Sequence, residues 1–144
     1  MEIILAENHG FCYGVKRAVE MANEAADSDG KSYTLGPIIH NPQVVGRLES
    51  KGVSPIQEVS DIDEGTMIIR SHGVGPAIYE EAEEKGLNIL DATCPHVKKA
   101  QQDAKSVIED GMTLVILGEK NHPEVKSINL WANNKGIIIE DEES

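Results

Sequence analysis

Two cysteines, 82 residues apart, open the same short sequence motif. Cys12 begins Cys-Tyr-Gly-Val-Lys-Arg-Ala and Cys94 begins Cys-Pro-His-Val-Lys-Lys-Ala, so both segments read Cys-x-x-Val-Lys-(Lys/Arg)-Ala. A single cysteine is more commonly an inert core residue than a ligand, but the repetition weakens that interpretation. A thiolate beside a helix N-terminus is stabilised by the positive end of the helix dipole, as ligation of a metal or cluster requires. The pair therefore suggests metal or redox chemistry.

The same offset relates two histidines. The motif Leu-Gly-x-x-x-His ends at His40 and again at His122, and each histidine is soon followed by Pro-(Gln/Glu)-Val. A third histidine, His72, follows another apolar run in the segment Ser-His-Gly-Val. Taken singly, each would be interpreted as a surface residue or a satisfied loop residue. Three of them before expected helices favour an anion cradle, built from imidazole N–H groups and helix N-terminal N–H groups.

Glu124 lies two residues after His122, at the expected start of a helix. A carboxyl group beside an anion site can deliver a proton to a reacting group. The same position also favours an acidic side chain for electrostatic reasons alone, because the helix dipole stabilises negative charge there. Both interpretations of Glu124 stay open from the sequence.

The chain alternates short apolar runs with segments whose apolar residues recur at helical spacing. The runs expected to form strands are Ile3 to Ala6, Tyr33 to Leu35, Met67 to Ile69, Asn88 to Leu90, Thr113 to Leu117 and Gly136 to Ile139. Residues 54–65 read as a polar connection without a strand. Alternating strands and helices predict an α/β fold with mainly parallel sheets, in which ligands bind beyond the carboxyl ends of the strands. The cysteines and the three histidines are all expected at that edge.

The repeated motifs predict an internal duplication with an offset of 82 residues. We expect tandem small α/β domains, the first covering residues 1–82 and the second covering residues 83–144. On this division the second copy is incomplete, so we expect the chain to be part of a longer protein.

Composition excludes several functional classes. A formal net charge of −12 argues against nonspecific nucleic-acid binding, because phosphate neutralisation needs clustered Lys and Arg. No apolar run approaches the length of a membrane span, and the first residues lack the features of a signal peptide. We therefore expect a cytoplasmic protein without a membrane partner. Two cysteines this far apart do not indicate a disulfide framework.

The motifs together resemble the N-terminal part of the 4-hydroxy-3-methylbut-2-enyl diphosphate reductase family. The segments that carry the resemblance, in the same order along the chain, are residues 10–18, 40–41, 71–74, 91–95 and 122–124. The resemblance implies three similar α/β domains around an oxygen-sensitive 4Fe–4S cluster held by three cysteines. It also implies reduction of (E)-4-hydroxy-3-methylbut-2-enyl diphosphate to isopentenyl and dimethylallyl diphosphates in the non-mevalonate isoprenoid pathway. The electrons would come from a donor such as ferredoxin or flavodoxin.

The family's functional residues can be transferred to matching positions of this chain. Cys12 and Cys94 would ligate the cluster, and Glu124 would relay a proton. The residues that would contact the substrate diphosphate are His40, His72 and His122. The third cysteine ligand is absent from this chain, which has two cysteines in all. The chain alone is therefore expected to be inactive.

The main alternative is a non-catalytic α/β module. In it Cys12, Cys94 and two of the histidines would bind a structural zinc ion, or the cysteines would act as a redox-sensing dithiol. The spacings match no compact zinc motif. A simple nucleotide-binding domain is a weaker alternative, because the chain has neither a Gly-x-Gly-x-x-Gly nor a Walker sequence.

Overall fold

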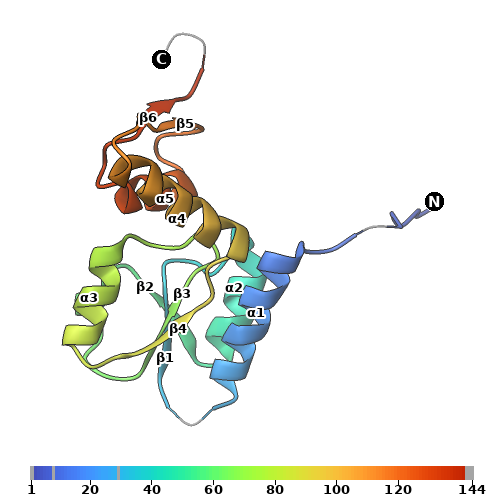
Figure 1. The fold of residues 1–144 in the computed structure, drawn as a ribbon. Coiled ribbons are helices and arrows are strands. Elements are labelled where there is room, and N and C mark those ends of the chain that lie inside the picture. Colours follow the sequence, from blue (N-terminus) through green and yellow to red (C-terminus); the bar gives the residue numbers. More distant parts are fainter. Residues whose placement is uncertain (1, 8, 29, 142–144) are drawn as a thin grey trace.

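The structure is a computed structural model that describes residues 2–7, 9–28 and 30–141. Its elements alternate between helix and strand along most of the chain (Figure 1). They are α1 (Tyr13–Ala26), β1 (Ser32–Leu35), α2 (Pro42–Ser50), β2 (Val53–Ile56), the 3-10 helix η1 (Val59–Asp61), β3 (Thr66–Ile69), α3 (Pro76–Glu84), β4 (Asn88–Asp91), α4 (Pro95–Glu109), β5 (Val115–Leu117), α5 (Pro123–Trp131) and β6 (Ile137–Ile139). Among the described residues, no helix has the length and apolar character needed to cross a membrane.

Four parallel strands form the first sheet, in the order β2-β1-β3-β4. Figure 1 shows α1 and α2 on one side of this sheet and α3 on the other. Met67, Ile68 and Ile69 in β3 are each completely buried. Ile68 joins the core beneath α1 and α2, whereas Met67 and Ile69 join the core beneath α3. Consecutive apolar residues form a strand here because both faces of a parallel sheet are covered.

The second sheet consists of β5 and β6, also paired in parallel. It is much less covered than the first, since Val115, Leu117 and Ile137 keep 54%, 79% and 54% of their surface exposed. Helix α4 precedes β5 and helix α5 precedes β6. These two helices pack against each other and lie between the two sheets in Figure 1. The expected α/β class with mainly parallel sheets is confirmed.

The order α1-β1-α2-β2 recurs as α4-β5-α5-β6. Cys12 and Cys94 occupy the same N-cap position of the first helix in each copy. The predicted duplication is therefore visible in the elements, and the second copy ends after two strands. The expected boundary at residue 82 falls inside α3. It also separates β4 from the first sheet, although β4 pairs with β3 in that sheet. Residues 1 and 142–144, at the ends of the two expected domains, lie outside the described residues. That residues 1–82 and 83–144 fold as separate domains stays a prediction.

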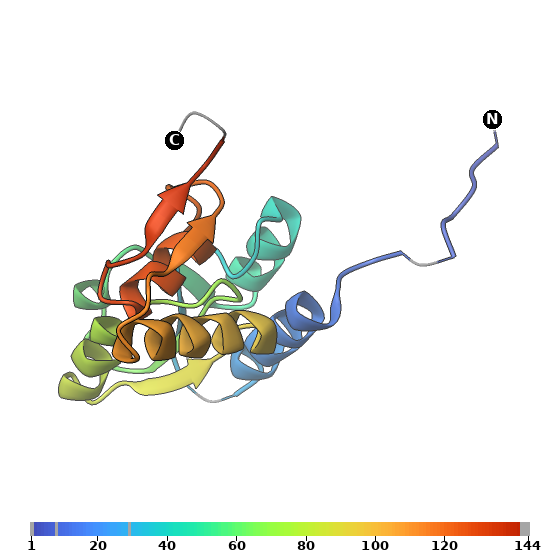
Figure 2. The ribbon, with the colours of Figure 1, turned by 45° about the horizontal axis from the view of Figure 1, so that its top comes forward.

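Two strand expectations need correction. Ile3 to Ala6 is not a strand, and Ile3, Ile4 and Leu5 are 75%, 83% and 76% exposed. Figure 2 shows this N-terminal segment leading away from the body of the molecule. The apolar pattern was misleading because a strand needs a neighbour for its N–H and C=O groups, and no described strand pairs with this run.

Conversely, the supposed polar connection contains β2. This strand has a buried residue at each end, Val53 and Ile56, with Ser54 and Pro55 between them. Pro55 is tolerated because β2 is an edge strand of the sheet. Such a strand has a neighbour on one side only, so the missing N–H of proline can face away from the sheet. The pattern has too few apolar residues to predict a strand.

A buried chain of hydrogen bonds joins the second copy to the first. The amide of Gln101 in α4 donates to the hydroxyl of Ser127 in α5 at 3.0 Å, and that hydroxyl donates to the carbonyl of His72 at 2.8 Å. Gln101 and Ser127 are 1% and 2% exposed. Nearby, the indole N–H of Trp131 donates to the carbonyl of Val74 at 2.9 Å. The loop after β3 is thus held against α5 by one buried link, through Ser127, and by a partly buried contact of Trp131.

We expect Ser127→Ala to lower the free energy of unfolding by about 1 to 3 kcal/mol, because it leaves a buried amide and a buried carbonyl without their partner. Urea unfolding followed by circular dichroism measures the change. Ser60→Ala is the matched control, since this exposed hydroxyl bonds only to the neighbouring Glu58. A Ser127 variant as stable as the Ser60 variant would contradict the role of the buried chain.

Candidate functional site

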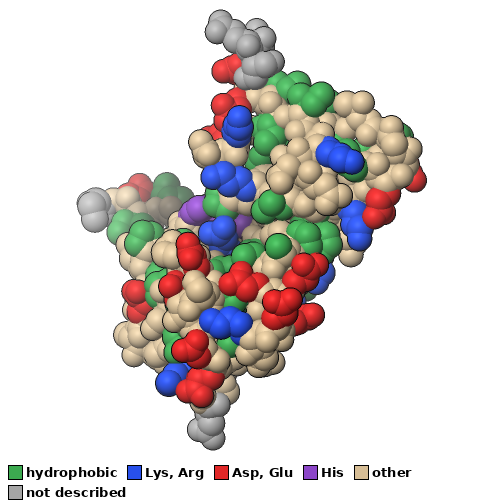
Figure 3. Space-filling view, turned by 90° about the vertical axis from the view of Figure 1, so that its left-hand side faces the viewer, with side chains coloured by type: hydrophobic (Ala, Val, Ile, Leu, Met, Phe, Trp, Pro, Cys, Tyr) green, Lys and Arg blue, Asp and Glu red, His purple; other side chains and the backbone are tan. Residues whose placement is uncertain are grey.

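Three imidazoles from three separate loops meet at the junction of the two sheets. His40 follows β1, His72 follows β3, and His122 is the N-cap of α5. The ring centroid of His40 lies 4.4 Å from that of His72 and 5.8 Å from that of His122, and the third separation is also 5.8 Å. Figure 3 shows histidine side chains (purple) recessed in a hollow, with Lys and Arg side chains (blue) nearby. The predicted convergence of these three residues is found in the structure.

The two copies cap their second helix differently. Asn41 caps α2 by accepting from the N–H groups of Gln43 and Val44, both at 3.1 Å, so His40 is free of that task. In α5 the cap is His122 itself, whose Nδ1 accepts from the N–H of Glu124 at 3.3 Å. An acceptor Nδ1 carries no proton, so neutral His122 bears its proton on Nε2. That N–H remains a donor for a ligand.

His40 is exposed, whereas His72 and His122 are partly buried. Burial, followed by the neighbouring His40, Arg70 and His122, lowers the pKa of His72 to about 4. The ring is therefore neutral near pH 7, because its protonation would place a second positive charge beside Arg70 in a partly buried site. Its Nδ1 is buried and has no hydrogen-bond partner among the described residues. Such an atom is unusual in a protein interior unless a ligand or water meets it.

The two cysteines lie where the N-termini of α1 and α4 meet. Both are free, Cys12 is exposed and Cys94 is partly exposed. Neither thiol caps its helix through a side-chain hydrogen bond, so both sulfur atoms are available as ligands. Gly14 packs against Cys94 so closely that a Cβ on Gly14 would overlap the Sγ atom. An iron–sulfur cluster is held by Cys thiolates, and a helix N-terminus stabilises a thiolate, so these two free cysteines fit the donor set of such a cluster.

Arg17 fixes this meeting of helices, a role that sequence analysis did not identify. Its guanidinium donates to the carbonyl of Thr93 at 3.2 Å and to that of Asp91 at 3.4 Å. Lys98 likewise pairs with the Asp91 carboxylate at 2.6 Å rather than facing only solvent. Burial raises the pKa of Asp91, but the hydrogen bonds from Lys98 and Thr93 outweigh it, and the net pKa is lowered. The signal was ambiguous because basic residues on a helix usually form a solvated face.

Glu124 lies in the first turn of α5 and is partly buried. Its position next to the capping histidine is the one that the sequence predicted. Ser127, whose carbonyl bonds position the His72 loop, was missed. The available signal was a small polar residue within the otherwise apolar inner face of α5, which indicates a buried hydrogen bond.

Comparison with known proteins gives a consistent picture. The family model described as "LytB protein" matches residues 3–144. The chain is 53% identical over 139 residues to a 4-hydroxy-3-methylbut-2-enyl diphosphate reductase of Geotalea uraniireducens (strain Rf4), covering 96% of this chain and 49% of that protein. It is 54% identical over 139 residues to the protein of the same name in Geobacter sulfurreducens, again covering 96% and 49%.

Two solved structures are also similar. A structure of (E)-4-hydroxy-3-methyl-but-2-enyl diphosphate reductase superposes with a TM-score of 0.84 at 49% identity, covering 98% of this chain and 52% of that one. A structure of the E-1-hydroxy-2-methyl-but-2-enyl-4-diphosphate reductase from Plasmodium falciparum gives a TM-score of 0.91 at 32% identity, covering 95% of this chain and 44% of that one. The chain thus spans about half the length of the curated relatives that it matches.

The lowered pKa of His72 makes stability depend on pH. Between about 6.5 and 4 the unfolded chain binds a proton that the folded chain does not, so the free energy of unfolding falls as pH falls through this window. Solvent screening reduces the effect at this partly buried ring, so the loss is on the order of 1 to 3 kcal/mol, and it ends below pH 4. Urea unfolding at several pH values should show this loss in the wild type but not in His72→Gln. His96→Gln, which changes an exposed histidine, should run parallel to the wild type. Parallel curves for all three proteins would contradict the assignment.

Proposed function

The chain belongs to the LytB protein family, and on that premise we propose that it forms part of a reductase acting on (E)-4-hydroxy-3-methylbut-2-enyl diphosphate. The products would be isopentenyl and dimethylallyl diphosphates. The observation that carries the proposal is the meeting of His40, His72 and His122 at one edge of the first sheet, beside the N-terminus of α5. A substrate with a diphosphate group needs such a concentration of N–H donors.

The three imidazoles would hold the diphosphate. His122 offers its Nε2–H because Nδ1 is engaged by Glu124. The α5 N-terminus adds its dipole and its N–H groups to the same place. A bound anion would also raise the pKa of His72, because a negative neighbour favours the protonated ring, whereas burial lowers this pKa. Binding can therefore bring a proton into the site together with the substrate.

Cys12 and Cys94 would supply two of the ligands of a 4Fe–4S cluster. Their free thiols, the helix N-termini beneath them and the lack of a side chain at Gly14 support this assignment. The third cysteine would come from a part of the protein outside this chain. When bound, such a cluster supplies electrons and Lewis acidity, whereas the residues of the chain bind, orient and protonate. Arg17 would hold α1 against the segment from Asp91 to Thr93 that precedes α4, and Lys98 would hold the Asp91 carboxylate of that segment.

Glu124 would provide a proton. Reductive removal of the hydroxyl breaks one C–O bond, forms one C–H bond and releases water, which consumes two electrons and two protons. The carboxyl group is two residues from the capping histidine and partly shielded from solvent. Because the helix dipole favours its ionised form, we propose a relay that is reprotonated in each cycle rather than a permanent acid.

An external electron donor such as ferredoxin or flavodoxin, and a cytoplasmic location, complete the proposal. The donor rests on the family resemblance, and the location rests on the apolar pattern and the first residues of the sequence. The exposure of Cys12 is compatible with transfer from a docked donor, because a ligand near the surface shortens the path between redox centres.

Cluster binding is tested by reconstituting the complete protein anaerobically and measuring iron and acid-labile sulfide. We expect Cys12→Ser and Cys94→Ser each to lower cluster content by at least about tenfold, since each removes a direct ligand. His96→Gln in the same helix as the second cysteine is the control and should retain the cluster. Iron content unchanged in both cysteine variants, or zinc bound in place of iron, would refute the assignment and favour the non-catalytic module.

Proton delivery is tested with Glu124→Gln in the complete protein. This change keeps the size and hydrogen bonding of the side chain but removes the transferable proton. We expect turnover to fall by about 10²-fold, with cluster content and substrate affinity retained. Glu119→Gln, an exposed acid in the preceding loop, is the matched control. Near-normal turnover of the Glu124 variant would contradict the proton relay and would leave Glu124 only the role of an acidic residue that stabilises the N-terminus of α5.

A further inference from the structure

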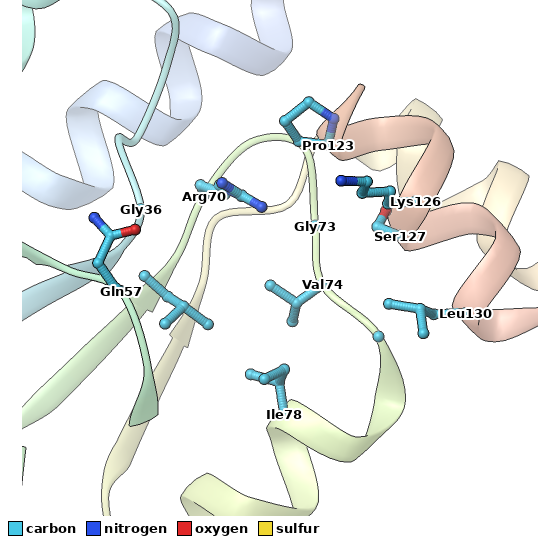
Figure 4. Close-up of a pocket in the computed structure, with 12 residues that line it drawn as sticks. Gly36, Gln57, Arg70, Gly73, Val74, Ile78, Pro123, Lys126, Ser127 and Leu130 are labelled. Carbon is cyan, nitrogen blue, oxygen red and sulfur yellow. The ribbon is translucent and has the colours of Figure 1, made fainter. Parts of the chain in front are cut away.

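A second concave site lies next to the histidines but includes none of them. This groove, about 310 Å³ in volume, runs between the carboxyl edge of the first sheet and α5. Figure 4 shows that its lining comes from the loop after β1, the loop after β3, the start of α3, and α5. We call it the Arg70–Lys126 groove after its two charged residues. No acidic residue lines it, although the chain has 25 Asp and Glu against 13 Lys and Arg.

The two cations have no partner of opposite charge. Figure 4 shows the side chains of Arg70 and Lys126 pointing toward one another at the end of the groove below Pro123. Among the described residues, neither side chain makes an ion pair or a hydrogen bond, and the Nε of Arg70 is buried without a partner. Burial lowers the pKa of this guanidinium. Arg70 is partly buried and Lys126 is exposed. Two facing cations repel one another, so the arrangement is complementary to an anion between them.

The backbone makes room for this arrangement. Gly36 has a φ of +71°, and a Cβ at this position would lie 2.6 Å from Nη1 of Arg70. Any other residue here would push the guanidinium from its place. Away from the two cations the groove is apolar, with Val74 and Ile78 among its walls (Figure 4). The groove therefore has a cationic end and an apolar end.

We propose that the Arg70–Lys126 groove binds a phosphate monoester with a short aliphatic group, at a site separate from the three histidines. A phosphate dianion matches two cations, whereas a carboxylate would neutralise only one. The planar fork of Arg70 suits two phosphate oxygens, and Lys126 adds a point charge. The aliphatic group would cover Val74 and Ile78, because the groove is larger than inorganic phosphate needs. This site does not depend on the proposed reductase activity.

Such a ligand would act on the same loop that carries His72. Arg70 and His72 are two residues apart, and the loop is also tied to α5 through Ser127. Binding of the monoester would thus restrain the loop that positions one imidazole of the neighbouring site. The two sites would share a structural element without sharing a lining residue among those described.

The test is titration calorimetry of the complete protein with n-butyl phosphate, compared with butyrate and inorganic phosphate. We expect n-butyl phosphate to bind most tightly. Arg70→Met should weaken its binding by about 10- to 100-fold, the range for one charge-assisted contact, and Lys126→Met should weaken it by a smaller factor. Lys120→Met, at an exposed lysine outside this groove, is the matched control and should bind normally.

The double variant His40→Ala/His122→Ala separates this groove from the histidine site and should retain n-butyl phosphate binding. Loss of binding in that variant, or unchanged binding in both Arg70→Met and Lys126→Met, would overturn the proposal. Butyrate binding as tightly as n-butyl phosphate would overturn the phosphate assignment. If Arg70→Met does not fold, Arg70→Lys replaces it, since loss of the planar fork alone should weaken binding.

Discussion

The hydroxyl of Ser127 is the contact on which the geometry of the site depends. It accepts from the amide of Gln101 and donates to the carbonyl of His72, so one small side chain links α4, α5 and the loop after β3. Because the chain of bonds is buried, none of its members can exchange its partner for water without a large cost. The positions of His72 and His122 relative to one another follow from this link. The separation of two imidazoles is thus set by a residue that touches neither ring.

A second constraint is electrostatic. Three imidazoles and Arg70 lie close together in a chain that is otherwise strongly acidic, and burial keeps His72 neutral. The site is organised for negative charge without carrying the full positive charge of three protonated rings. A free site of this kind avoids most of the repulsion between cations, and on the proposed function a bound anion would restore the charge. Stability of the unliganded protein and affinity for an anion are thereby reconciled in the same residues.

Much of the fold and of the site could be predicted because the decisive signals are local. The apolar period of α1 and α4, and the helix-start prolines at Pro42 and Pro123, depend on neighbours in the sequence. The repeated offset then placed both cysteines and two histidines at equivalent positions. What failed depended on partners elsewhere in the chain. Ile3 to Ala6 has the composition of a strand but no described strand beside it, and β2 is a strand only because β1 pairs with it.

The sparse cover of the β5–β6 sheet means that the described part of the molecule opens in two stages. Each strand has three residues, much of their apolar surface faces solvent, and the first sheet holds both fully developed cores. We therefore expect amide protons in β5 and β6 to exchange through local openings that leave the first sheet intact. His122 lies between these two strands in the sequence, at the start of α5, whereas His40 and His72 follow strands of the first sheet. An anion held by all three rings would oppose the local opening of β5 and β6. Part of its binding free energy would therefore be used to order the second copy.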